Sequence, residues 1–309
     1  MSAQTAVLGT AQLVGGLLLA PLLPGLVQHM KARLQGRRGP SPLQPYRELR
    51  RLWRKSGIEV EGTGIVARLA PSVAAAAIVA GVLLVPVGAV APSFGVGHDA
   101  LALAGLLALA RCVLAAAAWD TRNGFALQGA ARDLTLSVAV DAVLVLALAV
   151  AALEAGTTDL RGMVSGTAGG GVWASPTLVL GTVAFLLVVV AETGRQPVDN
   201  PDTHLELTMI HEGPLLEVGG RDLAYLQWAA AARHWLVLVL AALVFLPHPE
   251  SVWLQLAVLP AWLAALCAGL AVAETLVAKM RILLVPRLLG VGAAVALLGI
   301  VTWLVEATP

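Results

Sequence analysis

The stretch Leu134-Thr-Leu-Ser-Val-Ala-Val-Asp141-Ala-Val-Leu-Val-Leu-Ala-Leu-Ala-Val-Ala-Ala-Leu153 decides the fold class. Its 20 residues include one charged side chain, the carboxylate of Asp141. A helix of about 20 apolar residues crosses the hydrocarbon core of a bilayer. The stretch therefore predicts a transmembrane helix with an ionisable group inside the membrane.

The rest of the chain is similarly apolar. Of 309 residues, 58% are hydrophobic and 13% are charged, and the mean hydropathy is +0.83. This composition excludes an ordinary cytosolic enzyme, a disordered protein and a nucleic-acid-binding module with a basic face. The apolar runs are continuous, which argues against a β-barrel. We expect an all-α polytopic membrane protein, a single membrane domain over residues 1–309, with about eight transmembrane helices near 6–28, 69–91, 100–119, 134–153, 176–194, 228–247, 252–277 and 288–305.

The basic residues predict the orientation of these helices. With the N-terminus outside, the inner connections are 29–68, 120–133, 195–227 and 278–287, and they hold 17 of the 20 Lys and Arg residues. Cytoplasmic loops carry the excess of basic residues in membrane proteins. We therefore expect both termini on the outer, periplasmic side and a multi-pass protein of the cell inner membrane.

The first inner connection, residues 29–68, is the most basic one. Tyr46, Leu49, Leu52 and Trp53 recur there at helical spacing among arginines. This pattern predicts an amphipathic helix that lies along the membrane surface, where it either contacts anionic lipid or docks a soluble subunit. The candidate docking residues of the connection are Arg37, Arg38, Tyr46, Arg50 and Arg51.

The connection 195–227 is acidic instead. With the preceding helix end it holds seven acidic residues, namely Glu192, Asp199, Asp202, Glu206, Glu212, Glu217 and Asp222. Metal binding is disfavoured because the second histidine of a zinc-protease motif does not follow His211-Glu212. Two interpretations remain. The loop is solvated, or repulsion and partial burial adjust the pKa values of its carboxylates for proton transfer.

Charged residues also lie inside the predicted spans, where they are functional hints by default. They are Arg111, Asp141, Glu192, Arg233-His234 and Glu274. Glu274 and Arg281 would share a face if their helix continued over both. These groups either pair with one another or snorkel to the interface, or they form a chain of titratable groups that reaches toward the bilayer midplane. Cys112 and Cys267 are too few for an iron-sulfur cluster or a four-cysteine zinc site.

At these residues the chain resembles the eight-helix membrane subunit of respiratory complex I, its subunit 1 or H, and of the related group 4 membrane-bound [NiFe] hydrogenases. Ala191-Glu-Thr-Gly-Arg-Gln-Pro-Val-Asp199 looks like the complex I signature A-E-T-N-R-x-P-F-D. The elements Arg37-Arg-Gly-Pro40 with Gln44-Pro45, Ala70-Pro71, and Glu274 to Pro286 match others of the family in order. The stretch from Pro197 to Glu212 looks more like the hydrogenase-4 and formate hydrogenlyase branch.

Some residues depart from the complex I pattern. Gly194 replaces the Asn of the signature, Val198 its Phe, and Val218-Gly219 the Tyr-Ser of a later E-Y-S-G element. Asp141 stands where that family usually has Glu. These differences concern the proton path and any quinone contact, and they leave the expected topology unchanged.

The resemblance implies a function without a redox centre in this chain. The chain would anchor a cytoplasmic hydrogenase large subunit and an iron-sulfur small subunit, which hold the [NiFe] centre and the clusters, and it would lie beside antiporter-like membrane subunits. It would couple their electron transfer to proton or sodium translocation. The relay expected from the resemblance consists of Asp141, Glu192, Glu206, Glu212, Glu217 and Glu274, and Arg195 and Asp199 join the docking residues.

Three other functions remain open. A quinone-site subunit of a complex I type NADH dehydrogenase should have an opening between the first and fifth helices and the inner loop. A stand-alone secondary transporter should show internal repeats, and we find none in the sequence. A structural anchor should lose only stability when its buried carboxylates are neutralised.

Overall fold

The structure, a computed structural model, describes residue 10 and residues 13–57, 62–87, 98–168, 175–199 and 210–307. Over these ranges the chain is helical and forms no strand, apart from one isolated bridge between Asp99 and Asp159. The all-α prediction is therefore confirmed for the described part of the chain.

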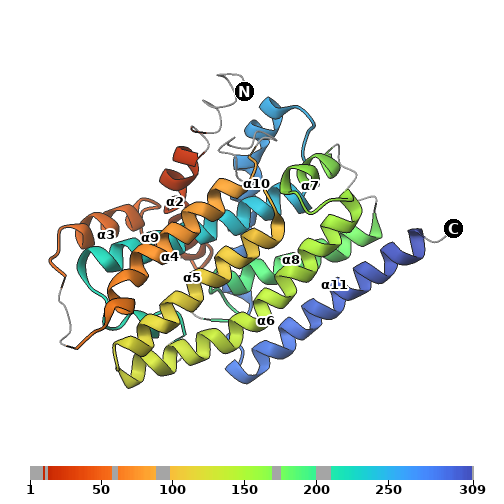
Figure 1. The fold of residues 1–309 in the computed structure, drawn as a ribbon. Coiled ribbons are helices and arrows are strands. Elements are labelled where there is room, and N and C mark those ends of the chain that lie inside the picture. The colour runs from red at the N-terminus through yellow and green to blue at the C-terminus, as the bar shows by residue number, and fades with distance from the viewer. Residues whose placement is uncertain are drawn as a thin grey trace.

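Eight apolar helices make up most of the described part of the chain (Figure 1). Seven of them are long and apolar enough to cross a membrane. Four are the single helices α4 (Ile65–Leu84), α5 (Ala100–Asp120), α6 (Gly124–Ala155) and α10 (Val252–Leu276). The other three are Leu13–Leu34, which includes α2 (Leu22–Leu34); α9 (Gly220–Leu240) together with the π-helical turn η4 (Ala241–Phe245); and Ile282–Ala307, which joins η5 (Ile282–Leu284) to α11 (Val285–Ala307). The eighth, α8 (Pro176–Glu192), has 17 residues, about 25 Å at a rise of 1.5 Å per residue. A polytopic membrane protein is thus supported, while the count of eight spans stays a prediction.

Three short helices lie between the long ones. They are α3 (Gln44–Trp53), which packs against α9 and α2, α7 (Leu160–Gly166), and the 3-10 turn η3 (Gly213–Leu215). The helix α3 carries three arginines of the first inner connection, Arg47, Arg50 and Arg51, and its side chain Leu52 is buried.

Several predicted boundaries are wrong because a helix continues past the apolar run that marks the lipid core. The first helix ends at Leu34 and not at 28, and α9 begins at Gly220 and not at 228. Most of the predicted connection 120–133 is helical, since α6 begins at Gly124. The side chain of Asn123 caps that helix by accepting hydrogen bonds from the backbone N–H groups of Phe125 and Ala126.

Another polar cap fixes an outer turn. The Asp99 carboxylate accepts hydrogen bonds from the backbone N–H groups of Leu101, at 2.7 Å, and Ala102, and from the hydroxyl of Thr158. The Leu101 N–H is the main reason that the pKa of Asp99 lies below its ordinary value. This cap ties the start of α5 to the segment that precedes α7.

Helix α9 forms the centre of the bundle. In its most apolar window 83% of residues are buried, whereas the figure is 22% for α10. Helix α8 packs between α6 and α11, and α4 packs along α5 (Figure 1). Small residues allow close contact, as membrane helices require: a Cβ on Gly181 would lie 2.8 Å from a methyl group of Val150. Phe185 of α8 stacks on Phe245 of η4 with ring centroids 4.5 Å apart.

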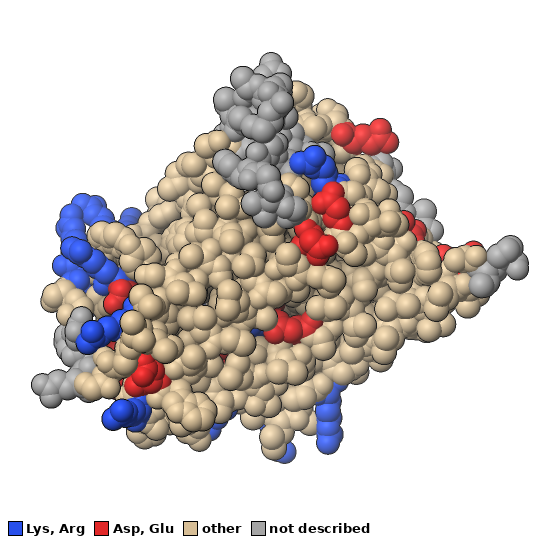
Figure 2. Space-filling model, in the orientation of Figure 1, with Lys and Arg blue, Asp and Glu red and all other residues tan. Residues whose placement is uncertain are grey.

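The charged side chains are unevenly distributed over the surface. In the face shown in Figure 2, most Lys and Arg side chains lie at the end of the bundle that carries α3 and the turn between α5 and α6. A broad band with few charged atoms, apart from a small acidic patch near its centre, separates them from the opposite end. This is the end at which the four predicted inner connections meet the helices.

Candidate functional site

Three helices bring an arginine and two carboxylates together inside the bundle. Arg111 of α5 donates a hydrogen bond to Glu192 at the end of α8, over 2.8 Å, and another to Asp141 of α6. We call Arg111, Asp141 and Glu192 the Arg111 cluster. The side chain of Glu192 is fully buried, whereas that of Asp141 is 27% exposed.

Two buried polar atoms of the Arg111 cluster form no hydrogen bond with another described residue. Among the described residues, neither Arg111 Nε nor Glu192 Oε2 has a hydrogen-bond partner, although both atoms are buried. Buried polar atoms are nearly always paired with protein or with ordered water. The two atoms belong to residues that line a cavity, so water in that cavity is the partner that the site offers.

A second cluster has the opposite composition. Glu274 of α10 forms ion pairs with Arg195, at 2.8 Å, and with Lys31 of the first helix, at 3.2 Å. We call Lys31, Arg195 and Glu274 the Glu274 cluster. All three side chains are at least 90% buried. The ion pairs of this cluster therefore connect α10 to the first helix and to the turn that follows α8.

The signature stretch Ala191–Asp199 connects the two clusters. Glu192 belongs to the first and Arg195 to the second, and Asp199 pairs with Lys279 at 3.5 Å. The turn is possible because Gly194 adopts φ +60°, a left-handed conformation that glycine adopts without strain. The backbone N–H of Met280 also bonds to the carbonyl oxygen of Pro197 at 3.0 Å, which fastens the turn to the segment after α10.

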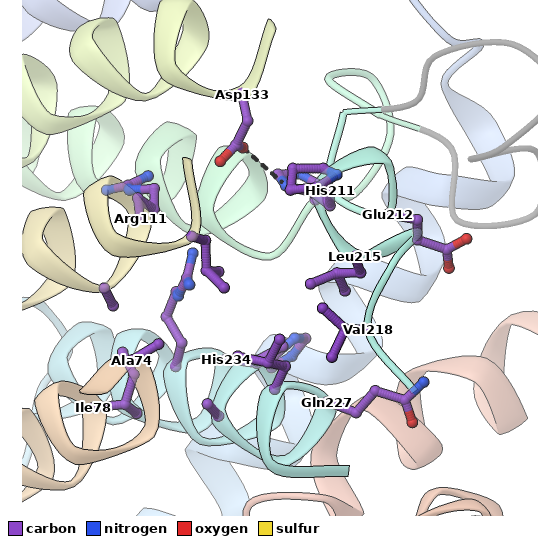
Figure 3. A pocket seen from close by; sticks show the side chains of 18 of the residues that line it. Ala74, Ile78, Arg111, Asp133, His211, Glu212, Leu215, Val218, Gln227 and His234 are labelled. Carbon is purple, nitrogen blue, oxygen red and sulfur yellow. Dashed lines mark ion pairs between the residues drawn. The ribbon is translucent and has the colours of Figure 1, made fainter. Parts of the chain in front are cut away.

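A cavity of about 540 Å³ adjoins the Arg111 cluster. Its charged and polar wall includes Arg111, Glu192, Asp133, His211, Arg233 and His234, and its apolar wall includes Ile78, Leu114 and Leu226. In Figure 3, Arg111, Asp133, His211 and His234 surround the space, and the carboxylate of Glu212 points away from it. Within the described ranges, Arg233 Nε and His234 Nε2 are buried without a hydrogen-bond partner.

His211 and Asp133 form an ion pair at this cavity. His211 Nδ1 lies 3.2 Å from Asp133 Oδ1. Burial lowers the pKa of His211, but the hydrogen bond and charge of Asp133, with a contribution from Asp199, outweigh this effect, so the pKa lies above its ordinary value.

Arg233 stands out in the sequence as a charge inside a predicted span, whereas Asp133 beside the cavity and Lys31 in the Glu274 cluster were not expected. Asp133 precedes Asp141 by eight residues, a spacing that places both near one helix face, but the apolar pattern assigns residue 133 to a loop and so hides this signal. For Lys31 we find no sequence signal, since its partners Glu274 and Arg195 are far from it along the chain.

The remaining predicted relay residues have different surroundings. Glu206 lies outside the described residues. Glu212 is exposed, and Glu217 accepts a hydrogen bond from the side chain of Asn123. Glu274 does not share a face with Arg281, because α10 ends at Leu276 and Val277 is extended. The condition on which that expectation depended is therefore not met.

The predicted docking residues divide into two groups. Arg37, Arg38, Arg50 and Arg51 are exposed. The Tyr46 hydroxyl donates a hydrogen bond to the carbonyl oxygen of Leu18 at 2.5 Å. Partial burial of Tyr46 raises the pKa of this hydroxyl. Arg195 and Asp199 are buried and form ion pairs with Glu274 and Lys279, so any part they play in docking would be to hold the turn in place, and that role stays a prediction.

The residues described here include no group of three or more His, Cys, Asp and Glu side chains that could hold a metal ion. Cys112 is exposed and Cys267 is buried. The chemistry available in the described site is that of hydrogen bonds, ion pairs and titratable groups.

Comparison with known proteins gives the family. The model of the NADH dehydrogenase family matches residues 8–305. Hydrogenase-4 component C of Escherichia coli K12 is 33% identical over 95% of this chain and 94% of its own length. Formate hydrogenlyase subunit 4 of the same organism is 31% identical over 93% of this chain and 94% of its own length.

The fold is also found in a solved structure. A chain in the structure of the membrane-bound sulfane sulfur reductase, an archaeal respiratory membrane complex, superimposes with a TM-score of 0.78 at 20% identity, over 97% of this chain and 99% of that one. The resemblance seen in the signature stretch is confirmed by the comparisons. The protein is therefore a multi-pass membrane protein that belongs to the NADH dehydrogenase family and is homologous to membrane components of hydrogenase-4 and formate hydrogenlyase.

Proposed function

We propose that this chain is the membrane subunit that anchors a cytoplasmic hydrogenase-type arm and couples electron transfer in that arm to proton or sodium translocation. The supporting observation is the Arg111 cluster, in which one arginine contacts two carboxylates inside the bundle beside a polar cavity. Ionisable groups within a membrane mark ion and proton paths by default.

The cluster has the chemistry that coupling requires. Two opposite charges 4 Å apart attract by about 4 kcal/mol at an effective dielectric constant of about 20. When Glu192 takes up a proton, Arg111 loses one of its two anionic partners and its contact with Asp141 becomes the stronger one. A proton or a charge shift at the α8 end of the cluster therefore changes the balance of forces on α6.

The exposed basic residues provide a docking surface for the arm. Arg37, Arg38, Arg50 and Arg51 lie on and near α3, at the end of the bundle where basic residues gather (Figure 2). We propose that this end faces the cytoplasm, that both termini are periplasmic, and that the partners are a hydrogenase large subunit with its [NiFe] centre, an iron-sulfur subunit and antiporter-like membrane subunits.

The test uses the whole complex in inside-out membrane vesicles. Reduced viologen serves as electron donor, hydrogen evolution reports turnover of the arm, and a pH-sensitive dye reports uptake of protons into the vesicles. We expect Asp141→Asn and Glu192→Gln to retain assembly and hydrogen evolution but to lose proton uptake. Glu154→Gln, on an exposed position of α6, is the matched control. Unchanged proton uptake in both cluster variants would overturn the proposal.

The quinone alternative makes a different prediction. It requires an opening that involves the first helix, whereas the described lining of the cavity comes from α4, α5, α6, α8, α9 and the loop before α9. Inhibition of redox turnover by quinone-site compounds, with no hydrogen evolved, would favour that alternative.

A further inference from the structure

The imidazole of His211 lies directly against the backbone of Gly194. A Cβ at residue 194 would be 2.8 Å from His211 Cδ2 and 2.9 Å from Nε2, closer than such contacts allow. Gly194 also has φ +60°, where a side chain would be strained. Glycine at position 194 therefore makes room for the histidine, which the turn Glu192–Arg195 could not otherwise accept.

His211 also reaches α6, through its ion pair with Asp133. The ring therefore bridges the loop before α9, the turn that holds Glu192, and the helix that holds Asp141. Among the described residues, the charged groups that act on it include Asp133 on α6, Asp199 after the turn and Arg233 on α9, and Arg111, Glu192 and His234 line the same cavity.

Exposure decreases along this set of residues. The side chain of His211 is 36% exposed, that of Asp133 15%, and that of Glu192 is fully buried. His211 is thus open to water on one side and lines the cavity that leads to Glu192 on the other (Figure 3). Histidine is the side chain that changes charge most readily near neutral pH.

We propose that His211, held by Asp133 and seated on Gly194, is the proton-exchange residue of the coupling site: it takes protons from cytoplasmic water and passes them through water in the cavity to Glu192. This inference rests on the proposed function and adds a residue to it. The proton binds at Nε2, Asp133 stabilises the imidazolium through Nδ1–H, and release from Nε2 regenerates the neutral ring. The proton then resides on Glu192, and no other bond forms or breaks.

The experiment is His211→Gln in the intact complex, with hydrogen evolution and vesicle proton uptake followed from pH 6 to 9. Glutamine retains a hydrogen-bonding side chain for Asp133 but does not titrate. We expect hydrogen evolution to persist, proton uptake per hydrogen to fall about tenfold or more, as for loss of a general acid-base group, and its pH profile to flatten. His29→Gln is the control, since His29 bonds to the carbonyl oxygen of Pro40 outside the site.

Gly194→Ala is the second variant, because it keeps a titratable histidine but removes its seat. It should reproduce the loss of proton uptake if the position of the ring matters. If His211→Gln and Gly194→Ala match the wild type at every pH while Asp141→Asn abolishes proton uptake, the role of His211 is overturned and the proposed function stands. If none of these variants changes proton uptake, the proposed function fails together with this inference.

Discussion

The Arg111 cluster and the Glu274 cluster are built on the same plan with the charges reversed. In the first, one arginine contacts two carboxylates, and in the second, one carboxylate contacts two basic side chains. The residue that contacts both partners is Arg111 in the first cluster and Glu274 in the second, and both are buried. Each of them connects segments that are distant in sequence. The two clusters meet at the turn between Glu192 and Arg195.

The two clusters differ in how far their side chains are exposed and in whether they line the cavity. Arg111 and Glu192 line the cavity, and Asp141 is partly exposed, whereas every side chain of the Glu274 cluster is at least 90% buried. A cluster with access to water has a route for protons, and a closed one holds its charges in place. On the proposed function, buried charge in this membrane protein serves two purposes, proton transfer and stability, and contact with the cavity distinguishes the two clusters.

The largest effect is expected when a cluster loses its shared residue. Glu274→Gln leaves Lys31 and Arg195 without the carboxylate that binds both, and such an uncompensated buried charge costs about 3–5 kcal/mol. We expect the amount of folded protein in membranes to fall sharply and the melting temperature to drop. Glu306→Gln, at an exposed position near the end of α11, is the control. A Glu274→Gln protein as stable as this control would show that the cluster contributes no stability.

A smaller effect is expected at the turn that links the clusters. Gly194→Ala forces a Cβ into the left-handed region, at a cost of about 1–2 kcal/mol, and it also displaces the ring of His211. Thermal unfolding in detergent measures this difference. Gly105→Ala is a suitable control because Gly105 lies in α5, where an added Cβ would meet no atom within 4 Å. An equal change in both proteins would remove the special role of the turn.

Lys31 and Asp141 each form only one of the two ion pairs of their cluster. Substitutions at these two residues should therefore distinguish an effect on stability from an effect on proton uptake. Lys31→Met and Asp141→Asn each leave the other ion pair of the cluster intact, so each should cost only about 1 kcal/mol. Only Asp141→Asn should abolish proton uptake, because Asp141 belongs to the cluster whose other two members, Arg111 and Glu192, line the cavity. Equal coupling defects in the two variants, measured in the same vesicles, would contradict the division of roles.

The smallest effect is a dependence of stability on pH. The pKa of His211 is raised in the folded protein, so its ion pair with Asp133 stabilises the fold fully below the ordinary histidine pKa of about 6.5. The stabilisation is lost as the pH rises through the folded-state value. The melting temperature of the wild type should therefore fall relative to that of His211→Gln over this range. A constant difference between the two proteins would argue against the pair.

Sequence reasoning succeeded where the signal was local. Apolar runs located the long helices, and Asp141, Glu192 and Glu274 stood out as charges within them. It failed at Asp133, because hydropathy marks the lipid core and not the end of a helix, and α6 extends to Gly124. The ion pairs of Arg195 and Asp199 were not expected either, since nothing local to the turn shows that Glu274 and Lys279 approach it, and the docking role of the two residues stays a prediction.

The sequence by itself determined the helical membrane architecture and the family, because both depend on continuous apolar runs and on one short motif. Only the tertiary structure decided which charges are partners and which of them line the cavity. Arg111 meets Glu192 across 81 positions of the chain, and Lys31 meets Glu274 from the other end of it. Such ion pairs depend on which helices pack side by side. The spacing of residues along the chain does not show which helices are neighbours.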